Sequence, residues 1–248
     1  MEVAIQRANF CITHPSIFGV VAEGDGQVIG SNFLDERDPI RGLGPVTVDP
    51  SVQVRGVGRR LMDAVLQRAS GAVGVRLVQD FFNMLSVSLY ASLGFEVKEP
   101  LLLMRGKPAS KPRPGIEVRP IRSKDVGECA ALCSRVHGFE RRNELLDALE
   151  ALSPLVAMRE GHVTAYALGL TTWSRSHAVA DTEEHMQALL LGAAAINSEP
   201  LSFLLPVRQA KLLPWCLSEG FRAVKPMTLM AMGRYQDPDG CCFPSILY

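Results

Sequence analysis

The hydrophobic positions of residues 46–69 change their period once, from that of a strand to that of a helix. Val46 and Val48 alternate with polar residues, and an Asp-Pro pair then ends the strand pattern. A loop with two glycines, Gly56 and Gly58, follows. Apolar residues then recur at helical spacing: Leu61, Met62, Val65, Leu66 and Ala69. This order predicts a strand, a glycine-containing loop and an amphipathic helix.

Two other patterns each occur twice, which indicates an internal duplication. A strand–turn–strand pattern with Val21-Ala22, Gly26 and Val28 recurs 135 residues later as Val156-Ala157, Gly161 and Val163. A second pattern recurs at an offset of 126: Gly94, Phe95, Pro100, Leu103 and Met104 are repeated as Gly220, Phe221, Pro226, Leu229 and Met230. Two collinear matches favour duplication over chance. The second copy is nine residues shorter where the first carries the glycine loop.

A proline-rich segment, GKPASKPRPG at residues 106–115, separates the two copies and predicts a linker. We therefore predict a first domain at residues 1–105, a second at 116–235 and an irregular tail at 236–248 docked across a domain surface. The second copy has a strand and a helical stretch ahead of its hairpin, for which the first has no room. We expect the first domain to lack an opening strand and helix, unless the true start lies upstream.

Composition and charge exclude several classes of protein. Of the 248 residues, 47% are hydrophobic, and Lys+Arg and Asp+Glu are equal at 26 each, so no nucleic-acid partner is expected. No apolar stretch reaches the length of a membrane span, and the N-terminus lacks the apolar core of a signal peptide. The six cysteines form no CxxC pair and predict reduced thiols in a cytoplasmic protein. The oligomeric state cannot be predicted.

The glycine loop has the chemistry of a phosphate site. A loop that opens a helix presents free backbone N–H groups at the positive end of the helix dipole, and glycines let a phosphate come close. Arg55, Arg59 and Arg60 add positive charge at the same place. A glycine-containing turn without a ligand is the alternative. The sequence has neither GxxxxGK[ST] nor GxGxxG, which excludes those two phosphate motifs.

Gln53-Val54-Arg55-Gly56-Val57-Gly58 resembles the Q/R-x-x-G-x-G/A signature of the GNAT family of N-acetyltransferases. The resemblance implies an α/β chain of the α+β type, with two tandem GNAT domains that each have a mixed, mostly antiparallel sheet flanked by helices. It also implies that acetyl-CoA is the co-substrate. The family's loop amides bind its pyrophosphate, here from Gln53 to Arg59. Backbone groups of the strand at Val46 and Val48 are implied to pair with the pantetheine arm, the amide near Val48 polarising the thioester carbonyl.

A second motif, Asn83-x-x-Ser86-x-x-Leu89-Tyr90-x-x-Leu93-Gly94-Phe95, resembles the closing helix of GNAT domains. The resemblance implies that Tyr90 protonates the departing thiolate, a role that suits a phenol of comparable pKa. Packing in the core is the alternative for Tyr90. Asn83 is implied to contact the pantetheine or the acetyl group, and a helix N-cap is the alternative.

No general base can be identified from the sequence. Asp35, Glu36 and Asp38 follow the first hairpin and are candidates, and the alternative is that each is a solvated loop charge. The resemblance also allows a water chain in place of a base, as in many GNAT enzymes. The second copy has no glycine where the loop should be, and Glu183 and Glu184 would repel a phosphate there. Cys216 stands at the counterpart of Tyr90, so this copy is predicted to be degenerate.

No metal site is expected, because His177, Asp181 and His185 are separated by a strand pattern. The sequence thus predicts an N-acetyltransferase that acts on a primary amine of a small molecule or peptide. The alternative is a non-catalytic acyl-CoA-binding or regulatory protein on the same scaffold. A purely structural or interaction module is a third possibility.

Overall fold

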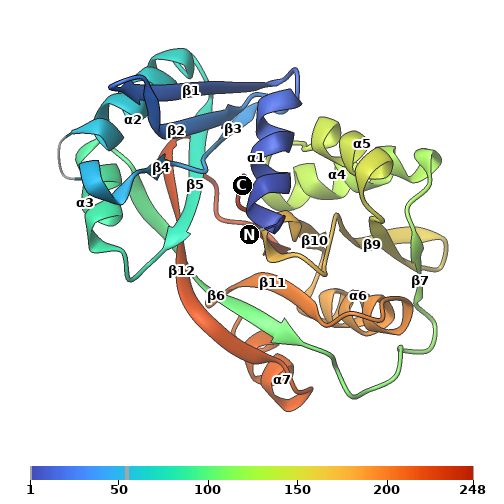
Figure 1. Ribbon diagram of the computed structural model, residues 1–248. Helices are drawn as coiled ribbons and strands as arrows, with labels where there is room; N and C mark the ends of the chain where they lie inside the picture. The colour runs from blue at the N-terminus through green and yellow to red at the C-terminus, as the bar shows by residue number, and fades with distance from the viewer. Residues whose placement is uncertain (1, 54–55, 248) are drawn as a thin grey trace.

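The computed structural model describes residues 2–53 and 56–247, which form two β-sheets flanked by helices (Figure 1). The helix expected after the glycine loop is α2 (Val57–Arg68). Its apolar stripe packs in the core, where Leu61, Met62 and Val65 are buried, and Ala69 just after the helix is buried with them. The strand that follows, β5 (Gly74–Asp80), is buried on both faces for most of its length, and this burial includes the polar side chains of Arg76 and Gln79.

The other elements of the first half are α1 (Glu2–Thr13), β1 (Ile17–Gly24), β2 (Gln27–Asp35), β3 (Ile40–Leu43), β4 (Thr47–Val48), η1 (Pro50–Val52), α3 (Met84–Ser92) and β6 (Glu96–Gly106). Those of the second half are β7 (Glu117–Pro120), η2 (Ser123–Asp125), α4 (Val126–His137), α5 (Arg142–Ala151), β8 (Leu155–Arg159), β9 (His162–Ala167), η3 (Trp173–Arg175), β10 (Ala178–Ala180), α6 (Glu183–Ile196), β11 (Leu201–Pro206), α7 (Leu212–Ser218), β12 (Arg222–Gly233) and β13 (Cys241–Phe243).

The two hairpins predicted to be copies have the same backbone. The β1–β2 pair shifts register after Ala22, and the β8–β9 pair shifts register after Ala157, 135 positions later. The turns also match: Asp25 and Gly26 have φ of 51° and 73°, and Glu160 and Gly161 have φ of 52° and 82°. Both glycines thus take the left-handed conformation that a tight hairpin turn requires. A shared bulge and turn support duplication more strongly than residue matches do.

The second repeated pattern also folds in the same way twice. Gly94 ends α3 with φ 94°, and Gly220 ends α7 with φ 99°. The amide of Phe95 donates to the carbonyl of Tyr90 at 3.1 Å, and the amide of Phe221 donates to that of Cys216 at 3.0 Å. Cys216 therefore occupies the place in the second copy that Tyr90 has in the first.

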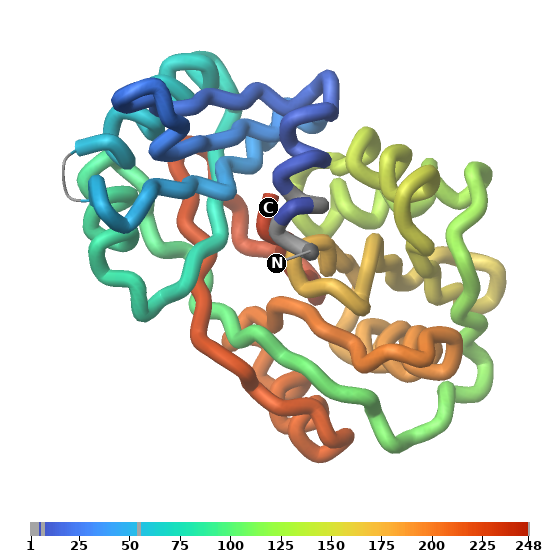
Figure 2. The backbone as a smooth tube through the Cα atoms, in the orientation of Figure 1, coloured from blue at the N-terminus to red at the C-terminus, as the bar shows by residue number. Residues whose placement is uncertain are grey.

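The two copies exchange a strand. The larger sheet has the order β1-β2-β3-β5-β12-β6-β11, so β12, from the second copy, lies between β5 and β6 of the first. Figure 2 shows the red β12 and the green β6 running side by side across the molecule. The registers of the two exchanged strands are symmetric. Met227 of β12 pairs with Asp80 of β5. The residues at the equivalent positions of the other copy, Leu101 of β6 and Pro206 of β11, also pair, and each lies 126 residues from its counterpart. The larger sheet therefore contains strands from before and from after residues 106–115. The predicted domain limits stay a prediction.

A helix that the sequence did not lead us to expect, α1, precedes β1 and takes the place that α5 has before β8. No counterpart of β7 or α4 precedes α1 in the residues described. Part of the tail, predicted to be irregular, is regular: β13 pairs antiparallel with β10 and completes the order β13-β10-β9-β8-β7 of the second sheet. Within residues 2–53 and 56–247, no helix is long and apolar enough to cross a bilayer.

Candidate functional site

A gap opens in the larger sheet beyond the pairing of β3 with β5, where β4 does not pair with β5. The preceding strand, β3, pairs in parallel with β5 at residues 40–42 and 74–76. Beyond that point β4 pairs only with β2, and residues 77–80 of β5 pair only with β12 among the described strands. Two strands that separate in this way present unused backbone edges to one another. An extended polar chain can fill such a gap by hydrogen bonding to both edges.

Two residues hold β4 in its displaced position. A Cβ at Gly30 of β2 would lie 2.8 Å from the Thr47 carbonyl oxygen, so only glycine lets β4 approach this closely. The Gln53 side-chain amide donates to the Val48 carbonyl at 3.2 Å and ties the loop back to the strand. The observed strand begins at Thr47, so Val46 lies in the segment between β3 and β4, where it packs against the core.

The gap leads to the start of α2. Gly56 is the N-cap residue in the left-handed conformation, with φ 80°, and no side chain caps the first turn. A Cβ at Gly58 would lie 3.7 Å from Val48 of β4 and 3.5 Å from Leu89 of α3, so this glycine lies between the two. An uncapped helix start with no acidic residue in its first turn attracts an anion.

The loop residues differ in which of their groups could contact a ligand. The Val57 side chain is buried, so only its backbone can face a ligand. Arg59 is exposed and donates to the Ser92 hydroxyl of α3 at 2.5 Å, which holds its charge over the same helix start. Val54 and Arg55 lie outside the described residues. Gln53 and the start of α2 thus lie beside the same gap.

Asn83 is a helix N-cap, which is the alternative given for it in the sequence analysis. It is the N-cap of α3, and its side chain accepts a hydrogen bond from the Ser86 amide at 3.2 Å. Asn83 is exposed, and contact between its other polar atoms and a ligand stays a prediction.

Tyr90 packs in the core, which is the alternative given for it above, and its role as a proton donor stays a prediction. Its side chain is 8% exposed and packs edge-on to Phe95, with 6.3 Å between the ring centroids. Burial raises the pKa of the Tyr90 hydroxyl above its ordinary value, and a hydrogen bond with Ser86 partly opposes this. The phenol is therefore protonated at neutral pH, which a proton donor must be.

The corresponding gap in the second copy is filled. By register β10 is the counterpart of β4: Ala180 pairs with Ala165 as Val48 pairs with Gly30, and Ala165 lies 135 residues after Gly30. The counterpart of β5 is β11, and β10 pairs with β13 instead of β11. The Phe243 ring of β13 stacks on Phe203 of β11 at 4.5 Å, and the Gln209 side chain donates to the Cys242 carbonyl at 2.7 Å. The chain's own tail thus lies where a ligand would lie in the first copy.

The helix that follows this filled gap is also closed to an anion. The Thr182 hydroxyl caps α6 by accepting from the His185 amide at 3.2 Å. Glu183 and Glu184 stand in its first turn, as expected from the sequence. The two helix starts therefore differ in both capping and charge.

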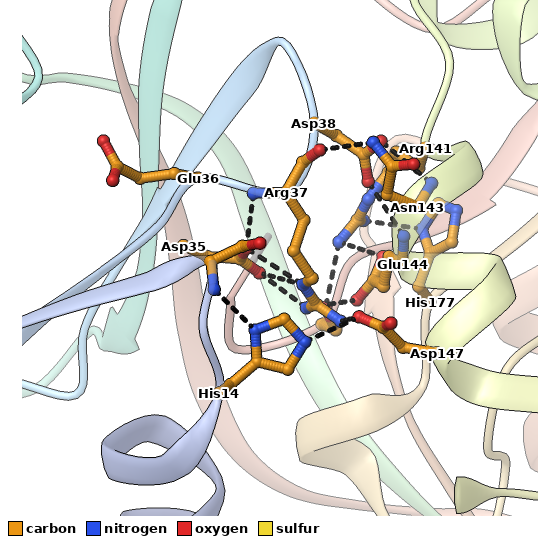
Figure 3. A network of polar contacts seen from close by, with 12 residues as sticks. His14, Asp35, Glu36, Arg37, Asp38, Arg141, Asn143, Glu144, Asp147 and His177 are labelled. Carbon is orange, nitrogen blue, oxygen red and sulfur yellow. Dashed lines mark hydrogen bonds and ion pairs between the residues drawn. The ribbon is translucent and has the colours of Figure 1, made fainter. Parts of the chain in front are cut away.

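The three carboxylates that were candidates for the general base each have a partner, and Figure 3 shows the contacts of Asp35 and Asp38. Glu36 pairs with Arg68 at 2.9 Å. Asp38 accepts from the amides of Asn143 and Glu144 at 3.1 Å each, and so caps α5 across the two copies. Asp35 pairs with Arg37 at 2.5 Å. Asp35 and Asp38 thus make contacts within and between the two copies, and Glu36 makes an exposed ion pair.

Arg37 is the centre of the polar network between the two copies. Its side chain is 6% exposed and contacts Asp35, Glu144 and Asp147 (Figure 3). Burial acts to lower the pKa of Arg37, but the hydrogen bond to Asp35 and the charges of Glu144 and Asp35 outweigh it and raise the pKa. The guanidinium therefore stays charged and holds the two copies together.

Three residues beside the gap were not singled out from the sequence. Asp80 ends β5, Lys225 comes from β12, and Trp173 comes from η3. The Lys225 ammonium pairs with Asp80 and lies 5.4 Å from the centre of the Trp173 ring. A carboxylate at the end of a buried strand was a usable signal for Asp80. The other two are brought there by the strand exchange, which the sequence pattern does not reveal.

Residues 15–97 match the model of a family described as "Acetyltransferase (GNAT) domain". This span runs from just before β1 into β6, and so contains the gap, the loop, α2 and Tyr90. No curated protein matches the chain.

Several solved structures share the fold over most of the chain. A putative acetyltransferase from Pyrococcus horikoshii is similar with a TM-score of 0.75 at 13% identity, over 96% of this chain and 82% of its own. A tandem GNAT protein from the clavulanic acid biosynthesis pathway is similar with a TM-score of 0.55 at 12% identity, over 90% of this chain and 85% of its own. A GCN5-related N-acetyltransferase from Sphaerobacter thermophilus has a TM-score of 0.57 at 15% identity, over 90% and 83%. The fold is thus an α+β fold of two tandem GNAT units.

Proposed function

We propose that this chain, whose residues 15–97 belong to the GNAT acetyltransferase family, is an N-acetyltransferase that uses acetyl-CoA bound once, in its first copy. The observation that carries the proposal is the contrast between the two gaps. In the first copy the gap between β4 and β5 leads to an uncapped helix start at Gly56, whereas in the second copy β13 fills the gap. One acetyl-CoA per chain is therefore expected.

Different residues would bind different parts of acetyl-CoA. The amides of the first turn of α2, from Val57 to Arg59, would hold the pyrophosphate, with charge from Arg59. The edges of β4 at Val48 and of β5 would pair with the pantetheine arm. Residues Val46, Val54, Arg55 and Asn83 belong to the same proposal through the family motif.

The transfer follows from this placement. The amine nitrogen attacks the thioester carbonyl carbon, a C–N bond forms and the C–S bond breaks. The backbone near Val48 polarises the carbonyl, and Tyr90 gives its proton to the departing thiolate and regains one from solvent. The proton lost by the amine passes to water, since Asp35, Glu36 and Asp38 are held in structural contacts.

Two measurements test the proposal in sequence. Calorimetric titration with acetyl-CoA should give one site per chain, and absence of binding at millimolar ligand would refute every cofactor-based function. Release of free thiol with a panel of primary amines should then be observed. Binding without thiol release with any amine would support the alternative, a non-catalytic acyl-CoA-binding protein.

A further inference from the structure

The buried hydroxyl of Tyr90 has a hydrogen-bond partner in its own helix. Tyr90 and Ser86 lie four residues apart in α3, so their side chains share one face of the helix. The hydrogen bond between the two side chains lowers the pKa of Tyr90, which is the effect of a bond donated to the phenol oxygen. Ser86 is therefore the donor, and the proton of the Tyr90 hydroxyl is available to another acceptor.

The two hydroxyl groups differ in their access to water. Tyr90 is 8% exposed, whereas Ser86 is half-buried and lies in the first turn of α3, beside the exposed residues Met84 and Leu85. A phenol that gives up its proton in every turnover must regain one, and a buried phenol meets little water. Ser86 thus joins the buried phenol to a part of the helix that water reaches.

The second copy has neither hydroxyl group at the equivalent positions. Leu212 and Cys216 stand 126 residues after Ser86 and Tyr90, and both are fully buried in α7. The pair of hydroxyl groups therefore occurs in the copy with the open gap, and apolar side chains replace it in the copy whose gap β13 fills. This contrast is expected of two groups that serve the same step.

We infer that Ser86 is a positioning residue that acts through Tyr90: it directs the phenol proton toward the departing thiolate and passes a proton from solvent back to Tyr90. This inference rests on the proposed function. The Tyr90 O–H bond breaks as the S–H bond of coenzyme A forms, the Ser86 proton passes to the Tyr90 oxygen, and water gives a proton to Ser86. The hydroxide so formed takes up the proton that the amine loses, so the protons balance.

Ser86→Ala should lower kcat about tenfold, because the effect of one lost hydrogen bond falls on the transfer step. The dissociation constant of acetyl-CoA should stay unchanged in calorimetry. The alkaline fall in rate should move to higher pH, since the hydrogen bond from Ser86 lowers the pKa of Tyr90. Ser86→Thr keeps a hydroxyl group and should restore both kcat and the pH profile. Asn83 caps the backbone amide of Ser86, so either substitution leaves that cap in place.

Ser88→Ala is the matched control. Ser88 is exposed in the same helix and lies two residues from both Ser86 and Tyr90, so it points away from their shared face. This variant should have the kcat and the pH profile of the unmodified protein. An equal loss of kcat in Ser88→Ala and Ser86→Ala would indicate a general effect on α3 and would overturn the inference.

A double substitution tests whether Ser86 acts through Tyr90. Thiol release is measured with acetyl-CoA and the fastest amine of the panel. In the Tyr90→Phe protein, Ser86→Ala should cause no further loss of kcat, since the phenol on which it acts is gone. An equal loss in both backgrounds would overturn the inference, as would full turnover by Ser86→Ala alone. In both cases acetyl-CoA binding and thiol release persist, whereas the absence of either would refute the proposed function itself.

Discussion

The backbone of Leu247 lies where a Cβ at Gly42 would stand, so the tail crosses β3 in direct contact with its main chain. Gly42→Ala must therefore push the tail away from the strand beside which the gap begins. We expect a loss of about 1–3 kcal/mol in the free energy of unfolding, the usual cost of overpacking. Urea unfolding monitored by circular dichroism measures this.

Gly127→Ala is the control for that change. A Cβ at Gly127 meets no atom within 4 Å and the residue lies in α4, so alanine should be neutral or stabilising by up to about 1 kcal/mol. A Gly42→Ala protein as stable as this control would show that the tail does not press on β3.

The buried guanidinium of Arg37 should be a major contributor to stability. Arg37→Met would leave the carboxylates of Asp35 and Glu144 buried without their cation, so we expect a loss of about 3–5 kcal/mol in the free energy of unfolding. Arg68→Met, which breaks an exposed pair with Glu36, is the control and should change stability little. Similar effects of the two substitutions would contradict the proposed role of the network.

Gly56→Ala should weaken acetyl-CoA binding about tenfold, because a methyl group would stand where the phosphate approaches the start of α2. Gly26→Ala is the matched control, since Gly26 also has positive φ and also has no atom within 4 Å of a Cβ. Both variants carry a similar backbone strain, so only a site effect separates their dissociation constants in calorimetry. Equal affinities would place the phosphate elsewhere.

Tyr90→Phe should lower kcat by about 10²–10⁴-fold if the phenol protonates the thiolate, while the ring contact with Phe95 and the affinity for acetyl-CoA are kept. Burial raises the pKa of Tyr90, so the rate of the unmodified protein should fall only above pH 10, as the phenol loses its proton. A pH–rate profile for both proteins tests this. Full turnover by the variant would leave Tyr90 with packing alone.

Acid should destabilise the protein through His137. Burial lowers the pKa of His137 to about 3, against about 6.5 in the unfolded chain. The unfolded state therefore binds a proton that the folded state does not between these values, and stability falls as the pH drops from about 6.5 toward 3. His137→Asn should reduce the slope of the free energy of unfolding against pH by about 1.4 kcal/mol per pH unit. Urea unfolding at several pH values measures this slope, and an unchanged slope in the variant would contradict the role of His137.

The local features of the site could be predicted from the sequence, because they depend on a few adjacent residues. A left-handed Gly56, a strand that ends at Asp49-Pro50 and an amphipathic α2 each follow from local rules. The duplication could also be predicted, since each copy keeps the residues of its own turn, Gly26 and Gly161.

The long-range features could not be predicted in the same way. The pairing of β12 with β5, and of β13 with β10, joins strands far apart in the chain, and a strand's alternation does not specify its partner. The contacts of Lys225 with Asp80 and Trp173 also join three segments that are far apart in the chain. Likewise, nothing local distinguishes Asp35 as the partner of a buried arginine from a solvated loop carboxylate.

The symmetric pairing of β6 with β12 also bears on how such a chain could have arisen. Each copy completes its sheet with the last strand of the other, so two separate single-copy chains could form the same sheet only by associating. The arrangement is that of a homodimer with exchanged C-terminal strands whose two subunits have been joined end to end. Covalent joining would leave one of the two gaps free to change, and in this chain the gap of the second copy holds β13.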